Sequence, residues 1–307
     1  MTSSAVAVHT FPMHWDGESI WQAVMALAQE RADTRLAGFS VEVLPCVDST
    51  NTELMRRARA GQTEATLLVA EQQTAGRGRL GRSWESGQDP AVGDSLTFSL
   101  GLMLSPASWD GLSLAVGVCL AENLAENLVA PNLNKSATPQ QSIGLKWPND
   151  LWLQGCKLAG ILIETMAAPA PMNSPVNSAA ASASSLRYAV IGIGVNIAPR
   201  PAQGLSTPPA WLQALQPGVT APLALARVAI KLLQGLLAFE AQGFAPFAPR
   251  FAARDALYGR SVSLSDGRSG VAKGVDGRGA LLVHTARGLE RVASAEVSVR
   301  PVQRPST

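Results

Sequence analysis

The pattern of apolar and turn residues changes at Leu257, and this change divides the chain into two folding units. After Leu257, short alternating runs (SVSL, GVAKGV, ALLVHT and EVSV) are separated by turn pairs such as Asp266-Gly267 and Asp276-Gly277. Asp-Gly favours tight hairpins because both central residues of such a turn adopt positive φ. About 45 residues of this kind predict a small β-barrel over 257–303.

The longer unit before Leu257 mixes helices and strands. Apolar residues at helical spacing predict helices over 17–31, 50–60, 111–129, 221–241 and 244–256. Apolar runs predict strands over 41–45, 66–71, 95–104 and 187–197, and a hairpin over 144–165 that turns at Gln154-Gly155. This mixture predicts an α+β domain with a mixed sheet over 41–256, after an N-terminal extension over 1–40. Residues 167–185 are rich in Ala, Ser and Pro and predict a surface insertion without chemistry.

Composition excludes several classes of protein. Among the 307 residues 47% are hydrophobic, which is enough for a core and excludes wholesale disorder. A net charge of +2 gives no sign of a nucleic-acid partner, and the three cysteines form no zinc-binding pattern. The N-terminus lacks the pattern of a secretory signal, and no apolar run approaches the ~18–20 residues of a membrane helix. We therefore expect a cytoplasmic protein that does not cross a membrane.

The segment Gly76–Ser83 (GRGRLGRS) nearly matches the phosphate-binding P-loop, with Arg82 where that motif has lysine. A P-loop leads into a helix whose first amides bind phosphate, but the residues from Trp84 to Pro90 do not form a helical pattern. We interpret the segment as a flexible loop whose arginines bind phosphate or carboxylate bidentately. A solvated basic loop and an Arg-Gly contact to RNA are the alternatives.

Two lysine-containing segments follow. KWPND (146–150) combines a rigid bend at Pro148 with Asn149 and Asp150, which can form hydrogen bonds or help to hold Mg²⁺. Lys157 borders the apolar run 158–163, where a lysine can stabilise an anion as it forms. Taken alone, such a lysine is more often an exposed turn residue.

Two further motifs have ordinary structural interpretations beside the functional ones. The run GIGVN (192–196) begins like a dinucleotide-binding fingerprint but lacks its third glycine, so we interpret it as a glycine turn that presents Asn196. Asp48-Ser49-Thr50 forms a helix N-cap, whose hydroxyls could also contact a polar ring bound at the helix start.

In this order the segments DSTN (48–51), EQQTAGRGRLGRSW (71–84), KWPNDLWLQGCKLAGIL (146–162) and IGIGVN (191–196) resemble the motifs of biotin protein ligases, the biotin–[acetyl-CoA-carboxylase] ligases. The resemblance extends over about residues 41–303. It implies a mixed-sheet catalytic domain similar to class II aminoacyl-tRNA synthetases and biotin/lipoate ligases, followed by an SH3-like β-barrel.

The resemblance also implies an activity: biotin is activated with ATP as biotinoyl-5'-AMP and transferred to a lysine of the biotin carboxyl carrier protein of acetyl-CoA carboxylase. Mg²⁺ would accompany ATP near Asp150. Lys157 and Arg79 would be the catalytic residues. The biotin-binding residues would be Ser49, Thr50, Asn51, Gln73, Arg77, Gly78, Arg79 and Lys157. Those on the ATP and adenylate side would be Arg77, Arg79, Arg82, Trp84, Lys146, Asn149, Asp150 and Asn196.

The chain departs from the bifunctional members of the family, which carry a winged helix-turn-helix before the catalytic domain. Residues 1–40 are too few for that module, so we expect no repressor function and no DNA partner. A lipoate ligase is the nearest alternative function, although GRGRLGR with KWPND disfavours it. A nucleic-acid-binding module is the second alternative, and a homodimer stays open.

Overall fold

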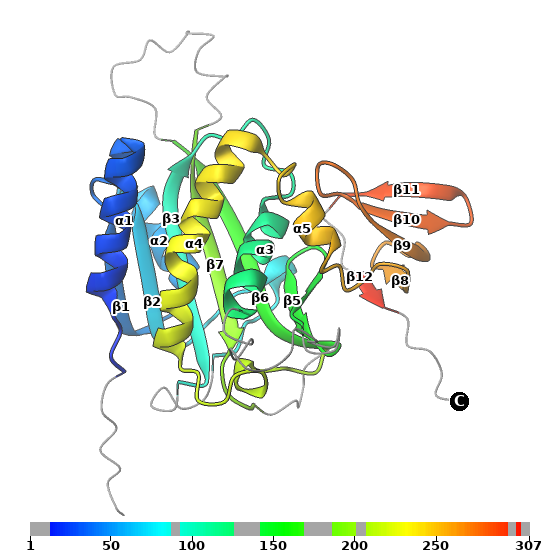
Figure 1. Cartoon of the computed structure of the whole chain (residues 1–307), viewed down its shortest axis with the longest axis horizontal. Coiled ribbons are helices and arrows are strands. Elements are labelled where there is room, and N and C mark those ends of the chain that lie inside the picture. The colour runs from blue at the N-terminus through cyan, green and yellow to red at the C-terminus, as the bar shows by residue number, and fades with distance from the viewer. Residues whose placement is uncertain are drawn as a thin grey trace, which may run out of the picture.

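The computed structural model describes residues 13–86, 93–125, 142–168, 186–200, 207–293 and 299–301. The larger domain is a seven-stranded mixed sheet with helices on both faces, and the smaller C-terminal domain is a five-stranded antiparallel sheet (Figure 1). The predicted fold class, an α+β domain with a mixed sheet followed by a small β domain, is confirmed.

The large sheet has the strand order β1-β2-β3-β7-β6-β5-β4. Its strands are β1 (Ser40–Val47), β2 (Thr66–Gln73), β3 (Ser95–Leu104), β4 (Gly144–Lys146), β5 (Asp150–Leu153), β6 (Cys156–Ala167) and β7 (Arg187–Asn196). The pair β1–β2 is parallel and α2 (Thr50–Arg59) connects it, whereas the other neighbouring strands are antiparallel.

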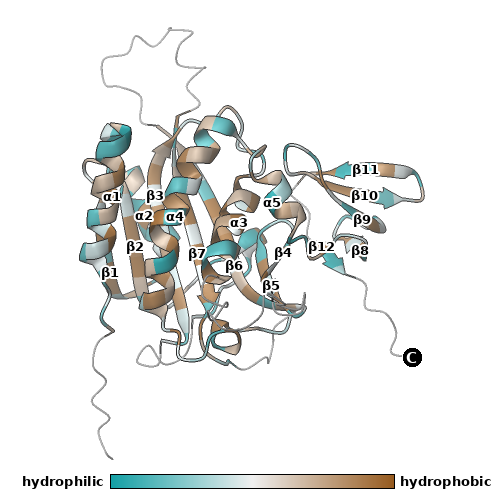
Figure 2. Cartoon of the chain, viewed as in Figure 1, coloured by the Kyte–Doolittle hydropathy of each residue, from teal (hydrophilic) through white to brown (hydrophobic). Residues whose placement is uncertain are grey.

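Alternation along the strands gives the sheet two apolar faces. Leu68 of β2 packs with Leu54 and Met55 of α2 on one face. Its neighbour Val69 belongs to the main core on the other face, together with α1 (Gly17–Arg31), α3 (Leu112–Ala125) and α4 (Ala221–Gln242). Figure 2 shows the central strands as hydrophobic and much of the outer surface of α1 as hydrophilic. This two-sided burial explains why the interior of β7 carries no polar side chain.

Helix α4 corrects the expectation that no apolar segment approaches the length of a membrane span. By length and composition alone, Ala221–Gln242 could cross a membrane. Its apolar side chains, among them Leu225, Leu232 and Leu236, are buried, and the helix contacts α3 and β3. In this structure α4 is a core helix of the larger domain.

Two predicted elements differ from the structure near the strand β4. The hairpin predicted over 144–165 has three strands, because KWPND forms a turn of its own between β4 and β5, with a cis peptide bond at Trp147-Pro148. The helix predicted over 244–256 is reduced to α5 (Ala248–Ala252). Beyond α5 the chain leaves the helix and pairs with β4, since Leu145 N donates to Arg254 O at 2.8 Å.

The insertion predicted over 167–185 begins inside a strand. Ala167 is the last residue of β6 and pairs with Arg187, the first residue of β7. Residues 169–185 lie outside the described residues, as do 1–12 of the N-terminal extension and 126–129 of the predicted third helix.

The C-terminal domain has the strand order β11-β10-β9-β8-β12. Its strands are β8 (Ser261–Leu264), β9 (Ser269–Val275), β10 (Leu281–Thr285), β11 (Gly288–Val292) and β12 (Val299–Pro301). The Asp276-Gly277 turn was predicted, and Asp276 Oδ1 shapes it by accepting hydrogen bonds from Arg278 N and Ala280 N at 2.9 Å each. This turn faces the larger domain, where Trp147 Nε1 donates to Gly279 O at 3.0 Å.

Candidate functional site

A cavity of about 980 Å³ lies where the two domains meet. It is bounded by the start of α2, the loop 76–84, β6, β7, the β4–β5 turn and two segments of the C-terminal domain, 259–261 and 299–301. The sequence-predicted site residues all line it: Ser49, Thr50, Asn51, Gln73, Arg77, Gly78, Arg79, Arg82, Trp84, Lys146, Asn149, Asp150, Lys157 and Asn196. The structure thus brings together residues that are separated by up to 147 positions in the chain.

The wall of the cavity is strongly basic. Among the described residues, two acidic side chains line it, Glu85 and Asp150. The eight basic ones are Arg77, Arg79, Arg82, Lys146, Lys157, Arg200, Arg260 and Arg300. Basic side chains focused in a concave site attract anions, so the cavity suits a ligand that carries several negative charges.

One end of the cavity is rich in uncharged hydrogen-bonding side chains. Ser49 is the N-cap of α2 and accepts a hydrogen bond from Thr52 N at 3.4 Å, which confirms the predicted helix cap. Gln73 Oε1 accepts from Thr50 N at 2.8 Å. Asn51, which is 3% exposed, donates from Nδ2 to Leu162 O at 3.2 Å. We call Ser49, Thr50, Asn51 and Gln73 the ring-end residues.

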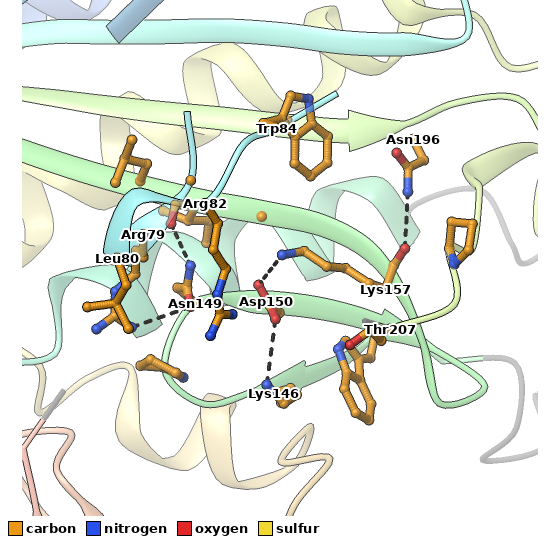
Figure 3. Close-up of a pocket in the computed structure, with 18 of the residues that line it drawn as sticks. Arg79, Leu80, Arg82, Trp84, Lys146, Asn149, Asp150, Lys157, Asn196 and Thr207 are labelled. Carbon is orange, nitrogen blue, oxygen red and sulfur yellow. Dashed lines mark hydrogen bonds and ion pairs between the residues drawn. The ribbon is translucent and has the colours of Figure 1, made fainter. Parts of the chain in front are cut away.

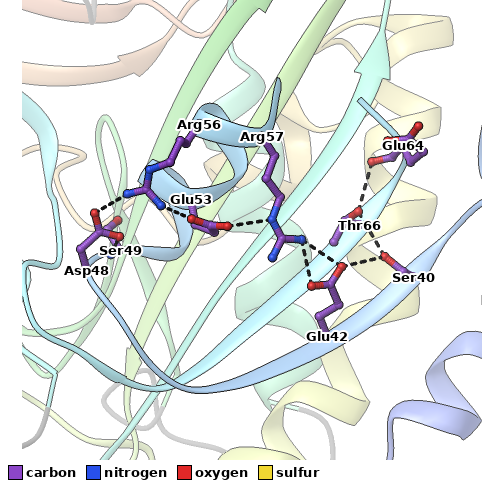
Figure 4. Close-up of polar contacts among 9 residues, drawn as sticks. All are labelled: Ser40, Glu42, Asp48, Ser49, Glu53, Arg56, Arg57, Glu64 and Thr66. Atoms are coloured by element: carbon purple, nitrogen blue, oxygen red, sulfur yellow. Dashed lines mark hydrogen bonds and ion pairs between the residues drawn. The ribbon is translucent and has the colours of Figure 1, made fainter. Parts of the chain in front are cut away.

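Ion pairs hold α2 against β1 and so fix the place of the ring-end residues (Figure 4). Arg57 pairs with Glu42 and with Glu53 at 2.8 Å each. Arg56 pairs with Asp48, the residue before the N-cap, at 2.6 Å. The helix start therefore faces the cavity in a set orientation.

Backbone hydrogen bonds close the loop 76–84 at its base. Trp84 N donates to Gly76 O at 2.8 Å, and Gly78 N donates to Arg82 O at 2.7 Å. Gly76 is required here, because a Cβ on it would lie 2.4 Å from Trp84 O. Residues 84–86 after the loop are not helical, as expected for a segment that is no P-loop.

The first two arginines of the loop reach different ends of the cavity. Arg77 Nη1 pairs with Glu164 Oε1 at 3.0 Å, beside the ring-end residues. Arg79 Nη1 lies 3.4 Å from Asn149 Oδ1 of the β4–β5 turn (Figure 3). Burial lowers the pKa of Arg79 from its usual value, although a guanidinium keeps its charge at neutral pH. Arg79 is therefore a partly desolvated cation on the basic side.

Asp150 stands between two lysines (Figure 3). Lys157 Nζ lies 2.8 Å from Asp150 Oδ1, and Lys146 Nζ lies 3.6 Å from Asp150 Oδ2. Burial lowers the pKa of Lys146, and the charge of Asp150 opposes this effect. The backbone of Lys157 is fixed on its outer side, where its N donates to Pro208 O and its O accepts from Ala210 N, both at 2.8 Å.

The glycines of GIGVN lie inside β7 and not in a turn, which corrects the prediction from the sequence. A Cβ on Gly192 would lie 1.9 Å from Asn51 Oδ1, and a Cβ on Gly194 would lie 2.3 Å from Trp84 Cε2. These glycines therefore allow two side chains to lie directly on the sheet. The Nε1 atom of Trp84 is buried on the side of the ring that lies against β7, and it has no hydrogen-bond partner among the described residues.

Asn196 ends β7, as predicted, but protein groups use its whole amide. Its Nδ2 donates to Lys157 O at 3.1 Å and to Ala210 O at 2.9 Å, and its Oδ1 accepts from Arg200 Nη1 at 3.0 Å. Arg200 also donates to Glu85 O at 2.8 Å. In this structure Asn196 holds the start of β6 in place, and its contact with ATP stays a prediction.

Four functional candidates were missed from the sequence because they belong to no motif. Ser99 and Glu164 contact the ring-end residues, and Arg260 and Arg300 come from the C-terminal domain. Ser99 is one of three hydroxyl residues in the run 95–104, and Glu164 follows the apolar run 158–163, so the sequence did not set either of them apart. The sequence gave no signal for Arg260 and Arg300, because their position at the cavity depends on how the two domains dock.

The chain is similar to known proteins over both domains that form the cavity. The model of the biotin/lipoate A/B protein ligase family matches residues 43–171, and that of the biotin protein ligase C terminal domain matches residues 259–300. The chain is 32% identical over 305 residues to the bifunctional ligase/repressor BirA of Escherichia coli, covering 97% of this chain and 85% of that protein. It is 30% identical over 265 residues to the biotin–[acetyl-CoA-carboxylase] ligase of Paracoccus denitrificans, covering 83% and 98%.

Solved structures agree. The biotin protein ligase from Aquifex aeolicus in complex with biotin and ATP superposes with a TM-score of 0.65 at 26% identity, covering 85% of this chain and 99% of that one. The two family models together match residues of both domains that line the cavity.

Proposed function

The chain belongs to the biotin protein ligase family, whose members attach biotin with the use of ATP, and we propose the finer course of this reaction. We infer that the chain makes biotinoyl-5'-AMP and transfers the biotinoyl group to a lysine of the biotin carboxyl carrier protein of acetyl-CoA carboxylase. The relatives named above support the class of reaction. The finer steps below are argued from the residues of this chain.

The observation that carries the proposal is that the cavity wall changes along β6, from uncharged hydrogen-bonding side chains at one end to the cation Lys157 at the other. The neutral ring-end residues lie beside Leu162, and Lys157 Nζ lies beside Gly160, where a Cβ would be 3.3 Å from it. Two residues of an extended strand span about 7 Å. A neutral polar ring at one end, a short apolar chain and a carboxylate at Lys157 fit this layout, and biotin has these parts in this order.

In the first step an oxygen of the biotin carboxylate attacks the α-phosphorus of ATP, the bond to the β-phosphate breaks and pyrophosphate leaves. Two anions must meet, so the barrier is largely electrostatic. Lys157 and Arg79 flank this point as cations already held in place, and fixed charges in a partly dry site stabilise developing charge without reorganising. Trp84 and the loop 76–84 would keep water from the anhydride.

In the second step the neutral amine of the carrier lysine attacks the carbonyl carbon of the anhydride. A C–N bond forms, the bond to the phosphate oxygen breaks, AMP leaves and the extra proton of the amine passes to solvent. The protein supplies no nucleophile, so a Ser/His/Asp set is not needed. The intermediate must instead be held until the carrier arrives, which is the role we give to Arg79 and Trp84.

Magnesium would enter with ATP and not occupy a site of its own. No group of three His, Cys, Asp or Glu side chains that could hold an ion comes together in the parts of the chain that are described. Asp150, the residue expected near the ion, has a lysine beside each carboxylate oxygen. These residues do not form a metal site, so phosphate oxygens would be the main ligands.

Biotin-dependent exchange of label between pyrophosphate and ATP tests the first step. We expect exchange with biotin and none without it or with lipoate, whose dithiolane ring offers no hydrogen-bonding groups to the ring-end residues. Equal exchange with lipoate would favour a lipoate ligase instead.

We also propose that this chain lacks repressor function and acts in the cytoplasm. Within residues 13–39 the structure has one α-helix, α1, and a one-turn 3-10 helix, Thr34–Leu36. A recognition helix needs a supporting helix, which this region does not supply. Titration with the operator of a biotin-synthesis gene should give only weak binding that vanishes with salt, and a footprint at physiological salt would overturn the proposal.

Light scattering would show whether the chain forms a homodimer.

A further inference from the structure

Arg200 is a cation of the cavity wall that has no role in the two reaction steps. Its side chain is 11% exposed, whereas that of its acidic partner Glu85 is 63% exposed. Arg200 Nη2 lies 3.3 Å from Glu85 Oε2, and an ion pair with so exposed a carboxylate contributes little. The turn before Arg200 is itself held in place, because the backbone N–H groups of Ile197 and Ala198 donate to Asp94 O at 2.8 and 3.1 Å.

The stronger contacts of Arg200 join two parts of the cavity wall. Its Nη1 donates to the backbone oxygen of Glu85 at 2.8 Å, directly after the loop 76–84. The same Nη1 donates to Asn196 Oδ1 at 3.0 Å, at the end of β7. Asn196 in turn donates from Nδ2 to Lys157 O at 3.1 Å. Arg200 therefore connects the end of the loop to the backbone of Lys157.

The indole of Trp84 lies between β7 and Lys157. A Cβ on Gly194 would be 2.3 Å from Trp84 Cε2, so the ring lies directly on the strand. Lys157 Nζ is 5.9 Å from the ring centroid, near the outer limit of a cation–π contact. A movement of this ring would open the space beside the ammonium of Lys157, where the anhydride would form.

The backbone around Trp84 has one anchor inside the loop and one outside it. Trp84 N donates to Gly76 O, which closes the loop but does not tie it to β7. Among the described residues, every hydrogen bond between residues 84–86 and a part of the chain outside the loop involves Arg200. Arg200 therefore fixes the peptide that follows Trp84.

We propose that Arg200 is a positioning residue that holds Trp84 over Lys157 and so retains the acyl-adenylate. Glu85 O, the Trp84 indole, Lys157, Asn196 and Arg200 form a closed ring of contacts, in which Arg200 joins the loop to β7. This inference rests on the proposed function, since the retained intermediate is biotinoyl-5'-AMP. Without Arg200 the peptide after Trp84 would move more freely, and water would reach the anhydride more often.

Arg200→Met tests the proposal, because methionine fills much of the same space and has no hydrogen-bond donor. The first measurement uses the ligand-free protein and follows the quenching of Trp84 fluorescence by acrylamide. The chain has seven tryptophans, so the signal of Trp84 is the difference between each protein and its Trp84→Phe counterpart. We expect stronger quenching of Trp84 in Arg200→Met than in wild type. Arg200→Lys keeps the buried charge without the planar fork and should change in the same direction, even if Arg200→Met does not fold.

The second measurement is the lifetime of preformed, labelled biotinoyl-5'-AMP on the protein after a chase of unlabelled biotin. In Arg200→Met it should shorten about tenfold, the effect of losing one good hydrogen bond. Glu85→Gln is the matched control, because it removes the exposed carboxylate and keeps the backbone oxygen, so its lifetime should equal that of wild type. In a Trp84→Ala background, Arg200→Met should shorten the lifetime no further, because both changes act through the same contact.

Unchanged quenching of Trp84 in the Arg200 variants, or an unchanged lifetime, would overturn the proposal. An equal shortening by Arg200→Met with and without Trp84 would also overturn it and make Arg200 a direct contact of the ligand. A loss in Glu85→Gln as large as in Arg200→Met would assign the effect to the ion pair instead. A wild type that forms no biotinoyl-5'-AMP would refute the proposed function itself, whereas the quenching measurement would still test the contact between Arg200 and the loop.

Discussion

At the scale of residues, the chemistry depends on a few cations that are held before any ligand arrives. Lys157 is fixed through its backbone by Pro208, Ala210 and Asn196, and its ammonium is paired with Asp150. Such a lysine can serve the reaction without contributing much to the fold. Its side chain is 31% exposed, and an ion pair of this kind stabilises by at most about 1 kcal/mol.

Lys157→Ala should therefore slow the activation of biotin strongly while leaving the fold intact. Loss of a preorganised charge at a developing anion typically costs about 10²–10³-fold in rate. Biotin-dependent pyrophosphate exchange measures the loss, and thermal unfolding checks the fold. Lys231→Ala, at an exposed position of α4, is the control and should exchange like wild type. Exchange near the wild-type rate in Lys157→Ala would remove this lysine from the mechanism.

Arg79→Gly should separate making the intermediate from keeping it. An arginine fork to the adenylate phosphate contributes about 1.5–3 kcal/mol as a charge-assisted hydrogen bond, whereas Lys157 remains to support the first step. If the loss appears in dissociation, release of biotinoyl-5'-AMP quickens roughly ten- to a hundredfold. The released anhydride then acylates accessible lysines, so an unrelated lysine-rich protein should be biotinylated in a blot. Labelling no greater than that by wild type, with adenylate still formed, would contradict a retaining role.

At the scale of elements, hydrophobic periodicity predicted most helices and strands, and the errors share one cause. Gly192 and Gly194 look like a turn in the sequence, but they lie in a strand. They are glycines because Asn51 and Trp84, more than 100 residues away in the chain, occupy the space where a Cβ would lie. The second part of the 244–256 helix is lost because residues 254–256 pair with β4. Glu164 and Ser99 gave no motif at all. Local patterns predict an element, but only its long-range partners decide what its polar and small residues do.

Deleting residues 169–185 should leave activity within a few-fold of wild type when a short Gly/Ser link joins the strands. Ala167 and Arg187 are direct partners in the β6–β7 ladder, so a short link can close the gap. This end of β6 is also the one far from Lys157. Pyrophosphate exchange and thermal unfolding should be measured together. A large loss of exchange in a variant that still folds would show that the segment has a function of its own.

At the scale of the whole molecule, the two domains share one cavity and are coupled through KWPND. Trp147 is fully buried and donates to Gly279 O of the C-terminal domain, while its neighbours Lys146 and Asn149 line the cavity. Gly279 must approach closely, because a Cβ on it would lie 2.8 Å from Gly111 Cα. Docking of the C-terminal domain therefore positions the basic wall.

Trp147→Phe should weaken ATP more than biotin. The change removes the bond to Gly279 O and leaves a buried carbonyl unpaired, at a cost of about 1–3 kcal/mol in the stability of the docked state. The KM for ATP should rise several-fold while the KM for biotin stays near wild type. Trp21→Phe, whose partly exposed indole donates to Phe39 O within the larger domain, is the matched control. Equal increases in both KM values would mean that the contact supports the fold in general.

The most direct test of the account is transfer to a defined lysine. The purified chain is incubated with labelled biotin, MgATP and a purified biotin carboxyl carrier domain, and the carrier is analysed by mass spectrometry. We predict one biotinoyl group on one lysine of the carrier. None should appear when that lysine is replaced by arginine, or when ATP is replaced by its α,β-methylene analogue, which cannot release pyrophosphate. An unmodified carrier under conditions where biotin-dependent pyrophosphate exchange proceeds, or equal modification with lipoate, would contradict the proposed function.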